Sequence, residues 1–236
     1  MVKVSVNSIL SVLFFPPRDI PNKADFVSRF IEHTTVFDAD PMILPIGQAP
    51  PPVPRIAMKS RDGRYVCEVS LDRLSFAYHD TRKQQRPLEG IYPEYREVLH
   101  HVILATLAGL RPSVVRLGFV TRNLVECGEG ANEWLRQTYL RPDRLPAGYE
   151  THVHILHRLE MESFRVNRWL KIWSLRDQAD PERDPAVAVE IDINTLPERE
   201  GRFDRSAILA FFLEGFDRAE KDLKTYVLDL LASDEA

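Results

Sequence analysis

The chain has 236 residues, of which 44% are hydrophobic and 28% are charged, and its formal net charge is −4 at pH 7. This composition is typical of a soluble globular protein, and its short apolar runs exclude a membrane helix, which needs about 20 residues. Two cysteines are too few for a disulfide framework and match no paired metal spacing. Residues 1–15 alternate like a strand and lack the pattern of a secretory signal, so we expect a cytoplasmic protein with no membrane partner.

The charge is unevenly distributed along the chain. Residues 51–125 contain 12 Lys and Arg against 7 Asp and Glu, whereas residues 181–236 contain 7 against 14. The basic stretch could contact phosphates. It could equally be an ordinary solvated surface, or the charge of one half could complement that of the other.

The first half begins with a strand, a helix and a proline-rich segment. Val2–Phe15 is rich in Val, Leu and Phe, and Pro16 and Pro17 end it because proline has no N–H for a ladder. Apolar residues at helical spacing predict a short helix over Asn22–Ile31. Pro45–Pro54 contains three consecutive prolines and is expected to be extended, either as a linker or as a strap.

A hairpin follows, and its register can be predicted. Asp62-Gly63 suits a two-residue turn in which both residues need positive φ. Pairing outward from this turn sets Ser60 opposite Tyr65, Met58 opposite Cys67 and Ile56 opposite Val69, so that one face is apolar.

A third strand and a long helix complete the first half. Arg73–His79 is predicted to be the strand, with Leu74, Phe76 and Tyr78 facing inward. Tyr92–Ala108 is predicted to be the helix, because Pro93 suits a first turn and Gly109 suits a helix end.

The second half repeats this order of elements. A strand at Val114–Val125 and a helix at Ala131–Tyr139 are followed by three strands and the longest helix. The predicted strands are Tyr149–Met161, Phe164–Leu175 and Ala186–Ile193, and the predicted helix is Phe203–Leu231. The hairpin turn at Glu162-Ser163 pairs Glu160 with Arg165, which brings opposite charges together.

The predicted fold is therefore α+β. It has two similar strand-helix-three-strand-helix halves, residues 1–112 and 113–236, each an antiparallel sheet backed by helices. We expect the halves to be fused through their first strands into one compact unit.

Several segments resemble a known family. Arg55–Tyr78, the motif Tyr92-Pro93-Glu94-Tyr95, and Val187–Asn194 with the helix after it are similar to a sporadically distributed, functionally uncharacterised bacterial protein family of about 250 residues. The resemblance covers most of the chain, but its motifs are structural and imply no catalytic residues. The order of strands and helices also resembles a SecB-type export chaperone, by analogy alone.

No catalytic constellation stands out in the sequence. His152 and His154 share one strand face, as do Glu190 and Asp192, and together they could suggest a metal site. In a meander the strand of Lys171 lies between them, which separates the pairs by about 9–10 Å, so no metal site is predicted. No phosphate-binding loop is present, and neither cysteine has a partner histidine in a motif. We predict no catalytic residue, no metal and no cofactor, and expect a protein that is not an enzyme.

The same strands predict an interface on the outer face of the second sheet. The hairpin register gathers two tryptophans, a leucine and several charged side chains there, a combination of aromatic anchors and polar rim. The predicted partner-binding residues are Trp169, Trp173, Lys171, Leu156, His152, His154 and Arg158. A partner protein, self-association, cover by another segment such as the proline strap, and a small ligand all remain possible occupants.

The leading hypothesis is a non-enzymatic protein-binding module, similar in role to an adaptor, a chaperone or an antitoxin. The alternative is a nucleic-acid-binding or processing protein that uses the basic strands of residues 55–86. Its phosphate contacts would come from Arg55, Lys59, Arg61, Arg64, Arg73, Arg82, Lys83 and Arg86.

Overall fold

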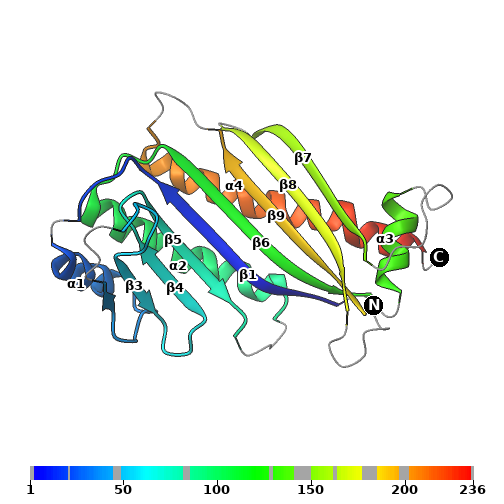
Figure 1. Cartoon of the computed structure of the whole chain (residues 1–236), viewed down its shortest axis with the longest axis horizontal. Coiled ribbons are helices and arrows are strands. Elements are labelled where there is room, and N and C mark those ends of the chain that lie inside the picture. Colours follow the sequence, from blue (N-terminus) through cyan, green and yellow to red (C-terminus); the bar gives the residue numbers. More distant parts are fainter. Residues whose placement is uncertain are drawn as a thin grey trace.

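The computed structural model describes residues 3–20, 22–44, 49–81, 86–127, 130–140, 150–161, 164–176, 185–196 and 202–234. These residues form a mixed α/β protein with a nine-stranded antiparallel sheet in the order β2-β3-β4-β5-β1-β6-β9-β8-β7 (Figure 1). The strands are β1 Lys3–Phe14, β2 Met42–Ile43, β3 Ile56–Lys59, β4 Tyr65–Val69, β5 Arg73–His79, β6 Arg116–Glu126, β7 His152–Met161, β8 Phe164–Leu175 and β9 Ala186–Thr195. The helices are α1 Lys23–His33, α2 Leu88–Leu110, α3 Ala131–Tyr139, α4 Arg205–Leu223, the π-helical turn η1 Lys224–Leu228 and α5 Asp229–Asp234.

The two halves share one nine-stranded sheet, whereas the sequence predicted a sheet in each half, fused through their first strands. β1 and β6 pair with each other from Lys3 opposite Glu126 to Phe14 opposite Arg116, and they lie at the centre of the sheet. The ladder therefore continues from one half into the other. The predicted fusion through the first strands of the two halves is the feature that joins them.

Strand positions and registers agree closely with the sequence prediction. Met58 pairs with Cys67 and Ile56 with Val69 in the first hairpin. In the second hairpin Glu160 pairs with Arg165, and the same register continues along the whole of β7. The predicted turn differs in one respect: Gly63 has a φ of 72°, whereas Asp62 is not in the positive-φ region, so only one residue of the turn needs glycine's freedom.

The helices lie on one face of the sheet, with α2 and α4 running behind the strands (Figure 1). α1 packs against α2, and α3 packs at the end of β8 and β9, where the Ser174 hydroxyl lies 3.5 Å from Asn132 Oδ1. At the contact between α1 and α2, a Cβ on Gly109 would lie 2.8 Å from the Phe26 ring. The helix continues past Gly109 to Leu110, so this glycine does not end the helix as predicted. Its missing side chain instead allows α1 and α2 to pack closely.

α2 also begins earlier than predicted. It starts at Leu88, so Pro93 lies inside the helix and not at its first position. The buried side chains of Leu88 and Ile91 explain the longer helix, because their apolar contacts stabilise the additional turn that precedes Pro93. The predicted helix Phe203–Leu231 is divided into α4, η1 and α5.

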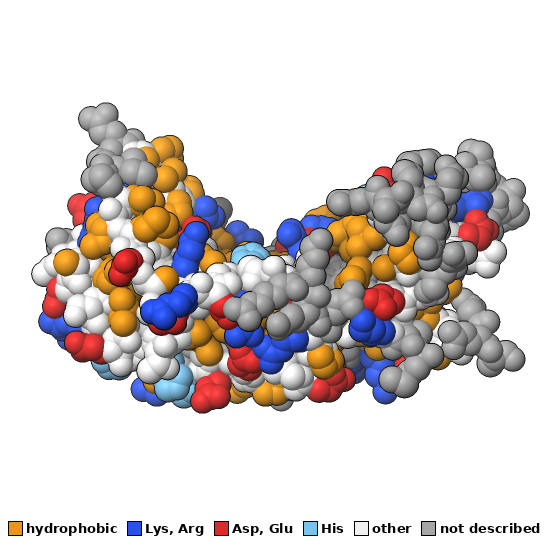
Figure 2. Space-filling model, turned by 90° about the horizontal axis from the view of Figure 1, so that it is seen from below, with side chains coloured by type: hydrophobic (Ala, Val, Ile, Leu, Met, Phe, Trp, Pro, Cys, Tyr) orange, Lys and Arg blue, Asp and Glu red, His pale blue; other side chains and the backbone are white. Residues whose placement is uncertain are grey.

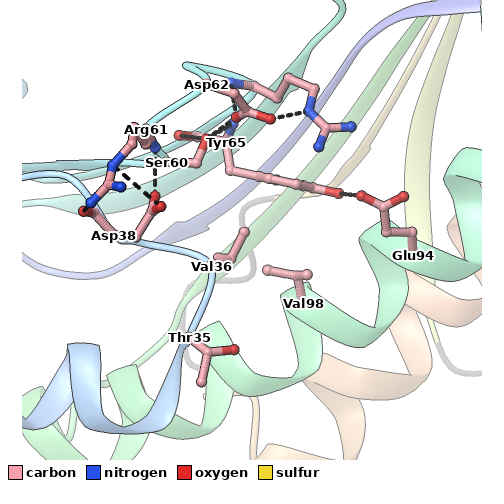
Figure 3. Close-up of a pocket in the computed structure, with 10 residues that line it drawn as sticks. Thr35, Val36, Asp38, Ser60, Arg61, Asp62, Tyr65, Glu94 and Val98 are labelled. Atoms are coloured by element: carbon pink, nitrogen blue, oxygen red, sulfur yellow. Dashed lines mark hydrogen bonds and ion pairs between the residues drawn. The ribbon is translucent and has the colours of Figure 1, made fainter.

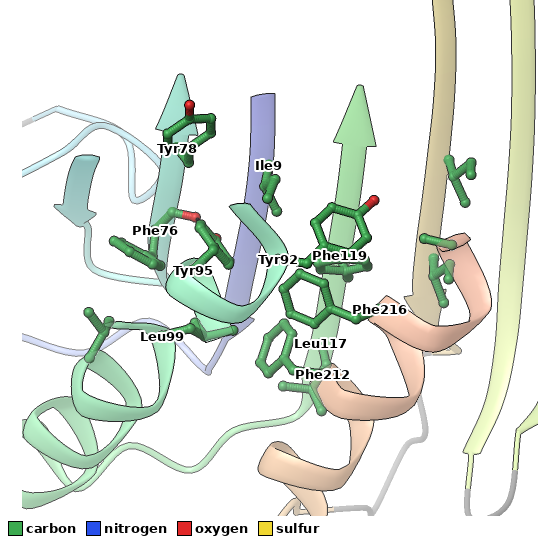
Figure 4. Close-up of a cluster of buried hydrophobic side chains, with 14 of the residues drawn as sticks. Ile9, Phe76, Tyr78, Tyr92, Tyr95, Leu99, Leu117, Phe119, Phe212 and Phe216 are labelled. Atoms are coloured by element: carbon green, nitrogen blue, oxygen red, sulfur yellow. The ribbon is translucent and has the colours of Figure 1, made fainter. Parts of the chain in front are cut away.

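The core fills the space between the sheet and the helices, and it is continuous across both halves. Its centre is aromatic: the Phe76 and Tyr95 rings stack at 4.8 Å, and the Phe119 and Phe216 ring centroids are 4.5 Å apart (Figure 4). α4 can approach β6 closely because a Cβ on Gly215 would lie only 3.3 Å from Phe119. The helices are thus held to one face of the sheet, which leaves the other face open.

Candidate functional site

The face of the sheet opposite the helices, called the open face below, is concave. In Figure 2 the molecule is hollowed along its upper side, between its two ends. A hollow of about 590 Å³ lies on this face and is lined by residues of β4, β5, β1, β6 and β9. A concave sheet surface of this width can hold a segment of another molecule.

The backbone register arranges the side chains of the open face in rows that cross the strands, because paired residues of neighbouring strands share a face. One of these rows, called the apolar row below, is apolar except for Asp192 on β9. The apolar row consists of Val66, Ala77, Leu10, Val120, Asp192, Trp169 and Leu156. It joins the hollow to the tryptophan face that the sequence predicted.

A second row, called the charged row below, runs beside the apolar row. It contains Arg122, Glu190, Lys171 and His154 on neighbouring strands. The carboxylate of Glu190 accepts a hydrogen bond from Lys171 Nζ at 2.6 Å and another from Arg122 Nε at 2.5 Å. Burial raises the pKa of Glu190, but the hydrogen bonds from Lys171 and Arg122 outweigh burial and hold the pKa below its usual value. Glu190 therefore acts as an ionised link between two cations.

Asp192 is in a different environment, although it lies on the same strand face. Burial raises the pKa of its carboxyl above the usual value, and the cation of Lys171 only partly opposes that effect. The side-chain amide of Asn194 donates a hydrogen bond to Asp192 Oδ1. Asp192 is thus a half-buried carboxyl within an otherwise apolar row, where a partner's hydrogen-bond donor would be favoured.

The structure brings the seven predicted partner-binding residues onto the open face. Leu156 pairs with Trp169, His154 with Lys171, and His152 with Trp173. The His152 and Trp173 rings are nearly parallel, with centroids 6.4 Å apart, and Trp173 lines a second hollow of about 330 Å³. Leu156 is 43% exposed, which is high for a leucine within a strand, and Arg158 is exposed beside it.

The described part of the proline strap does not cover this face. Pro51 accepts a hydrogen bond from the backbone of Leu71, and Pro52 accepts one from Arg73 Nη2 at 3.3 Å. These contacts hold the strap beside β5, whereas Trp169 and Trp173 lie on β8, four strands away in the sheet. Cover by the described part of the strap is therefore excluded for the two tryptophans.

The basic residues of the nucleic-acid alternative are mostly engaged within the protein. Arg55 is buried and donates to the Ala49 carbonyl at 2.6 Å, and Arg73 lies within 4.0 Å of Asp72. Arg61 pairs with Asp38, Arg64 with Asp62, and Arg86 with Glu94. Lys59 is exposed, and Arg82 and Lys83 lie outside the described residues. Five of the eight predicted residues are therefore buried or paired with a carboxylate, and Lys59 is the described residue of the set for which no such contact is seen.

Some of these pairs surround a polar pocket of about 440 Å³ that the sequence did not predict (Figure 3). The Tyr65 hydroxyl donates to Glu94 at 2.5 Å, and Arg86 donates to the same carboxylate at 2.7 Å. Burial raises the pKa of Glu94, but the hydrogen bonds from Arg86 and Tyr65 outweigh it and lower the pKa overall. Charges of both signs therefore face the pocket. The sequence placed Tyr65 on the apolar face of its hairpin. It did not predict the contact with Glu94, which belongs to α2.

The described part of the chain supports neither metal binding nor thiol chemistry at Cys67. No group of three or more His, Cys, Asp and Glu in those residues could hold a metal ion. Cys67 is fully buried, and burial raises the pKa of its thiol, which makes it unreactive. Among the described helices, none is long and apolar enough to span a membrane.

Comparison with protein-family models gives no match, and comparison with curated proteins gives none. The resemblance to an uncharacterised bacterial family and the analogy with SecB therefore stay predictions.

Proposed function

We propose that this protein is a non-enzymatic protein-binding module, with a role like that of an adaptor, a chaperone or an antitoxin, and that it binds a segment of another protein on its open face. The observation that carries the proposal is the apolar row. It leads from the hollow of about 590 Å³ across to Trp169 and the 43% exposed Leu156.

The composition of the open face supports a protein partner. Aromatic side chains supply large contact areas at low entropic cost, and a rim of charges of both signs provides orientation. Trp169 and Trp173 are the anchors, and the charged row around Glu190 forms part of the rim. The apolar row crosses seven strands, a span of about 29 Å at the usual strand spacing of about 4.8 Å. An amphipathic helix of about five turns has this length.

The same features argue against a nucleic-acid partner on this face. Glu68, Glu190 and Asp192 line the hollow, and carboxylates repel a phosphate backbone. The cations there are partly neutralised, because Arg122 and Lys171 share Glu190. A protein segment with both apolar and charged side chains fits this surface better.

We also propose that residues 1–112 and 113–236 are two copies of one ancestral unit. The order of the sheet supports this, since β1 is followed outward by β5, β4 and β3, and β6 is followed outward by β9, β8 and β7. In this arrangement the middle of the open face lies on the boundary between the copies.

The test is partner capture with matched variants. Tagged wild type, the double variant Trp169→Ala/Trp173→Ala, and the control Leu213→Ala are each used to capture partners from lysate of the source organism, with and without nuclease. Leu213 is 53% exposed and belongs to α4, on the helix side of the molecule. We expect a nuclease-resistant protein that the wild type and the control capture and the double variant loses.

Two other results would contradict the proposal. A protein captured equally well by all three forms would bind elsewhere on the molecule. Partners that disappear after nuclease treatment would favour the nucleic-acid alternative. Far-ultraviolet circular dichroism of the double variant checks that the loss reflects the surface and not unfolding.

A further inference from the structure

β7 forms one edge of the sheet, and in the described part of the chain it pairs only with β8. It is ten residues long, contains no proline, and runs in unbroken register from His152 to Met161. Natural edge strands are usually protected by short length, proline or a bulge, because unpaired backbone groups attract another strand. β7 has none of these three protections.

The backbone groups on the outer side of β7 can be assigned. The Ser174 amide donates to the Thr151 carbonyl at 3.4 Å, so Thr151 directs its backbone groups toward β8. These directions alternate along an antiparallel strand. His152, His154, Leu156, Arg158 and Glu160 therefore direct their N–H and C=O groups away from β8, toward the open edge.

We propose that β7 pairs with β7 of a second copy of this chain, antiparallel and about a two-fold axis at His157, so that the two sheets become one. This inference goes beyond the proposed function, because it concerns the edge of the sheet and not the open face. A two-fold contact requires a self-complementary surface. The sequence of β7 meets that requirement.

On the open face, the proposed register pairs opposite or compatible groups. His154 lies opposite the partner's Glu160, and Leu156 lies opposite the partner's Arg158, whose aliphatic stem can cover it. By symmetry, each contact is made twice. These are the residues whose backbone groups point outward, so they form the hydrogen-bonded pairs of the new ladder.

On the helix side, the same register sets His157 opposite the partner's His157 at the axis and pairs apolar residues on either side of it. Ile155 lies opposite the partner's Leu159, and Val153 lies opposite the partner's Met161. Ile155 and Leu159 are both only partly buried within one chain, so the contact would remove apolar surface from water. A register centred on Leu156 fits less well, since it would set His154 opposite the partner's Arg158 and Ile155 opposite the partner's His157.

A second copy is thus favoured over an unrelated strand, because β7 supplies both members of the His154–Glu160 pair and both members of each apolar pair. Pairing at this edge also leaves Trp169 and Trp173 on the open face. Glu160 is not among the predicted partner-binding residues, so loss of self-association in a Glu160 variant can be distinguished from loss of the partner binding proposed above.

The first test is the molar mass in solution, measured by sedimentation equilibrium over a range of concentrations. We expect a dimer for the wild type and a monomer for Leu156→Pro. Proline at this position removes an outward N–H and leaves the hydrogen bonds between β7 and β8 intact. A monomeric wild type, or a dimeric Leu156→Pro variant with unchanged circular dichroism, would overturn the proposal.

A charge exchange provides a second test that does not depend on proline. Glu160→Lys should weaken the dimer by about tenfold, because it replaces two favourable pairs with unfavourable ones. His154→Glu combined with Glu160→Lys should restore the dimer, since the exchanged charges again face each other in this register. If the double variant is as weak as Glu160→Lys alone, the proposed register is wrong.

Discussion

The two sides of the sheet differ in how their outer strands are supported. β3, β4 and β5 contain four, five and seven residues, whereas β7, β8 and β9 contain ten, twelve and ten. The short strands rest on an aromatic cluster. The long strands are supported in part by a buried cluster of charges, which is unusual in a protein core.

The aromatic cluster is continuous from strand to helix. Tyr65 stacks on Phe76 at 5.8 Å, and Phe76 stacks on Tyr95 of α2 at 4.8 Å. The Tyr95 hydroxyl donates to the Phe76 carbonyl at 2.8 Å. This side of the core therefore depends on ring packing, supplemented by a few hydrogen bonds.

The charged cluster lies between β8 and the last helical segments. Arg168 is fully buried and donates from Nη1 to Asp222 Oδ1 at 2.7 Å, and Arg218 Nε lies 3.1 Å from the same oxygen. His157 lies 2.6 Å from Arg168 Nη2, and the Arg168 guanidinium lies over the Tyr226 ring at 5.2 Å. The π-helical turn η1 begins two residues after Asp222. This side of the core therefore contains two arginines that share one buried carboxylate.

The two edges of the sheet differ as well. β2 has only two residues and is preceded directly by Pro41, so it offers few backbone groups to another strand. β7 is long and free of proline. The two halves therefore differ in what supports their outer strands and in whether the strand at the edge of the sheet can be extended.

The largest expected effect comes from breaking the charged cluster. Asp222→Ala leaves Arg168 buried without its carboxylate, and should lower the free energy of unfolding by about 3–5 kcal/mol. Urea unfolding followed by circular dichroism measures this change. The double variant Arg168→Met/Asp222→Leu should recover most of the loss, because no buried charge is left without its partner there. A loss below about 1 kcal/mol for Asp222→Ala would show that the cluster is not an essential support.

A smaller effect is expected in the aromatic cluster. Tyr95→Phe removes the hydrogen bonds of the hydroxyl with the Phe76 carbonyl and with the Ser11 hydroxyl but keeps the stacked ring, so it should cost about 0.5–1.5 kcal/mol. The matched control is Tyr78→Phe, since the buried Tyr78 hydroxyl has no hydrogen-bond partner among the described residues. The control should be neutral or slightly stabilising in the same urea experiment. Equal losses for both variants would contradict this account of the cluster.

The smallest expected effect concerns the polar pocket at Glu94 and depends on pH. The pKa of Glu94 is lower in the folded protein than in the unfolded chain, because hydrogen bonds from Arg86 and Tyr65 outweigh burial. Its ionised form therefore stabilises the fold above the unfolded pKa, and this contribution is lost as the pH falls through the folded pKa. Glu94→Gln should reduce stability by less than about 1 kcal/mol at pH 7.

The difference between wild type and Glu94→Gln should shrink as the pH falls from about 5 toward 3, where the wild-type carboxyl becomes protonated. Thermal unfolding at a series of pH values measures the difference. A gap that widens on acidification would reverse the sign expected from the lowered pKa.

Local pattern was enough to predict eight of the nine described strands and the registers of the two hairpins. Alternation has a period of two, and a shift by one residue would expose the apolar face, so the pairs Met58–Cys67 and His152–Trp173 followed from the sequence. The same rule gathered the seven residues around Trp169 and Trp173 on one face. Helix α3 was also predicted with its observed bounds.

Other features depended on contacts between distant segments. The early start of α2, the π-helical turn and the ion pair of Arg168 with Asp222 each involve partners that no local pattern identifies. The polar pocket likewise joins Tyr65 to Glu94 across 29 positions.

The sequence by itself determined the elements, their pairing within each half and the composition of the candidate binding surface, because these follow from side-chain periodicity and turn chemistry. Only the tertiary structure decided that the two halves share one nine-stranded sheet and that the face opposite the helices is hollowed. These properties arise from the packing of β1 against β6 and of α2 and α4 behind them, and packing between distant segments is not encoded in any single stretch of chain.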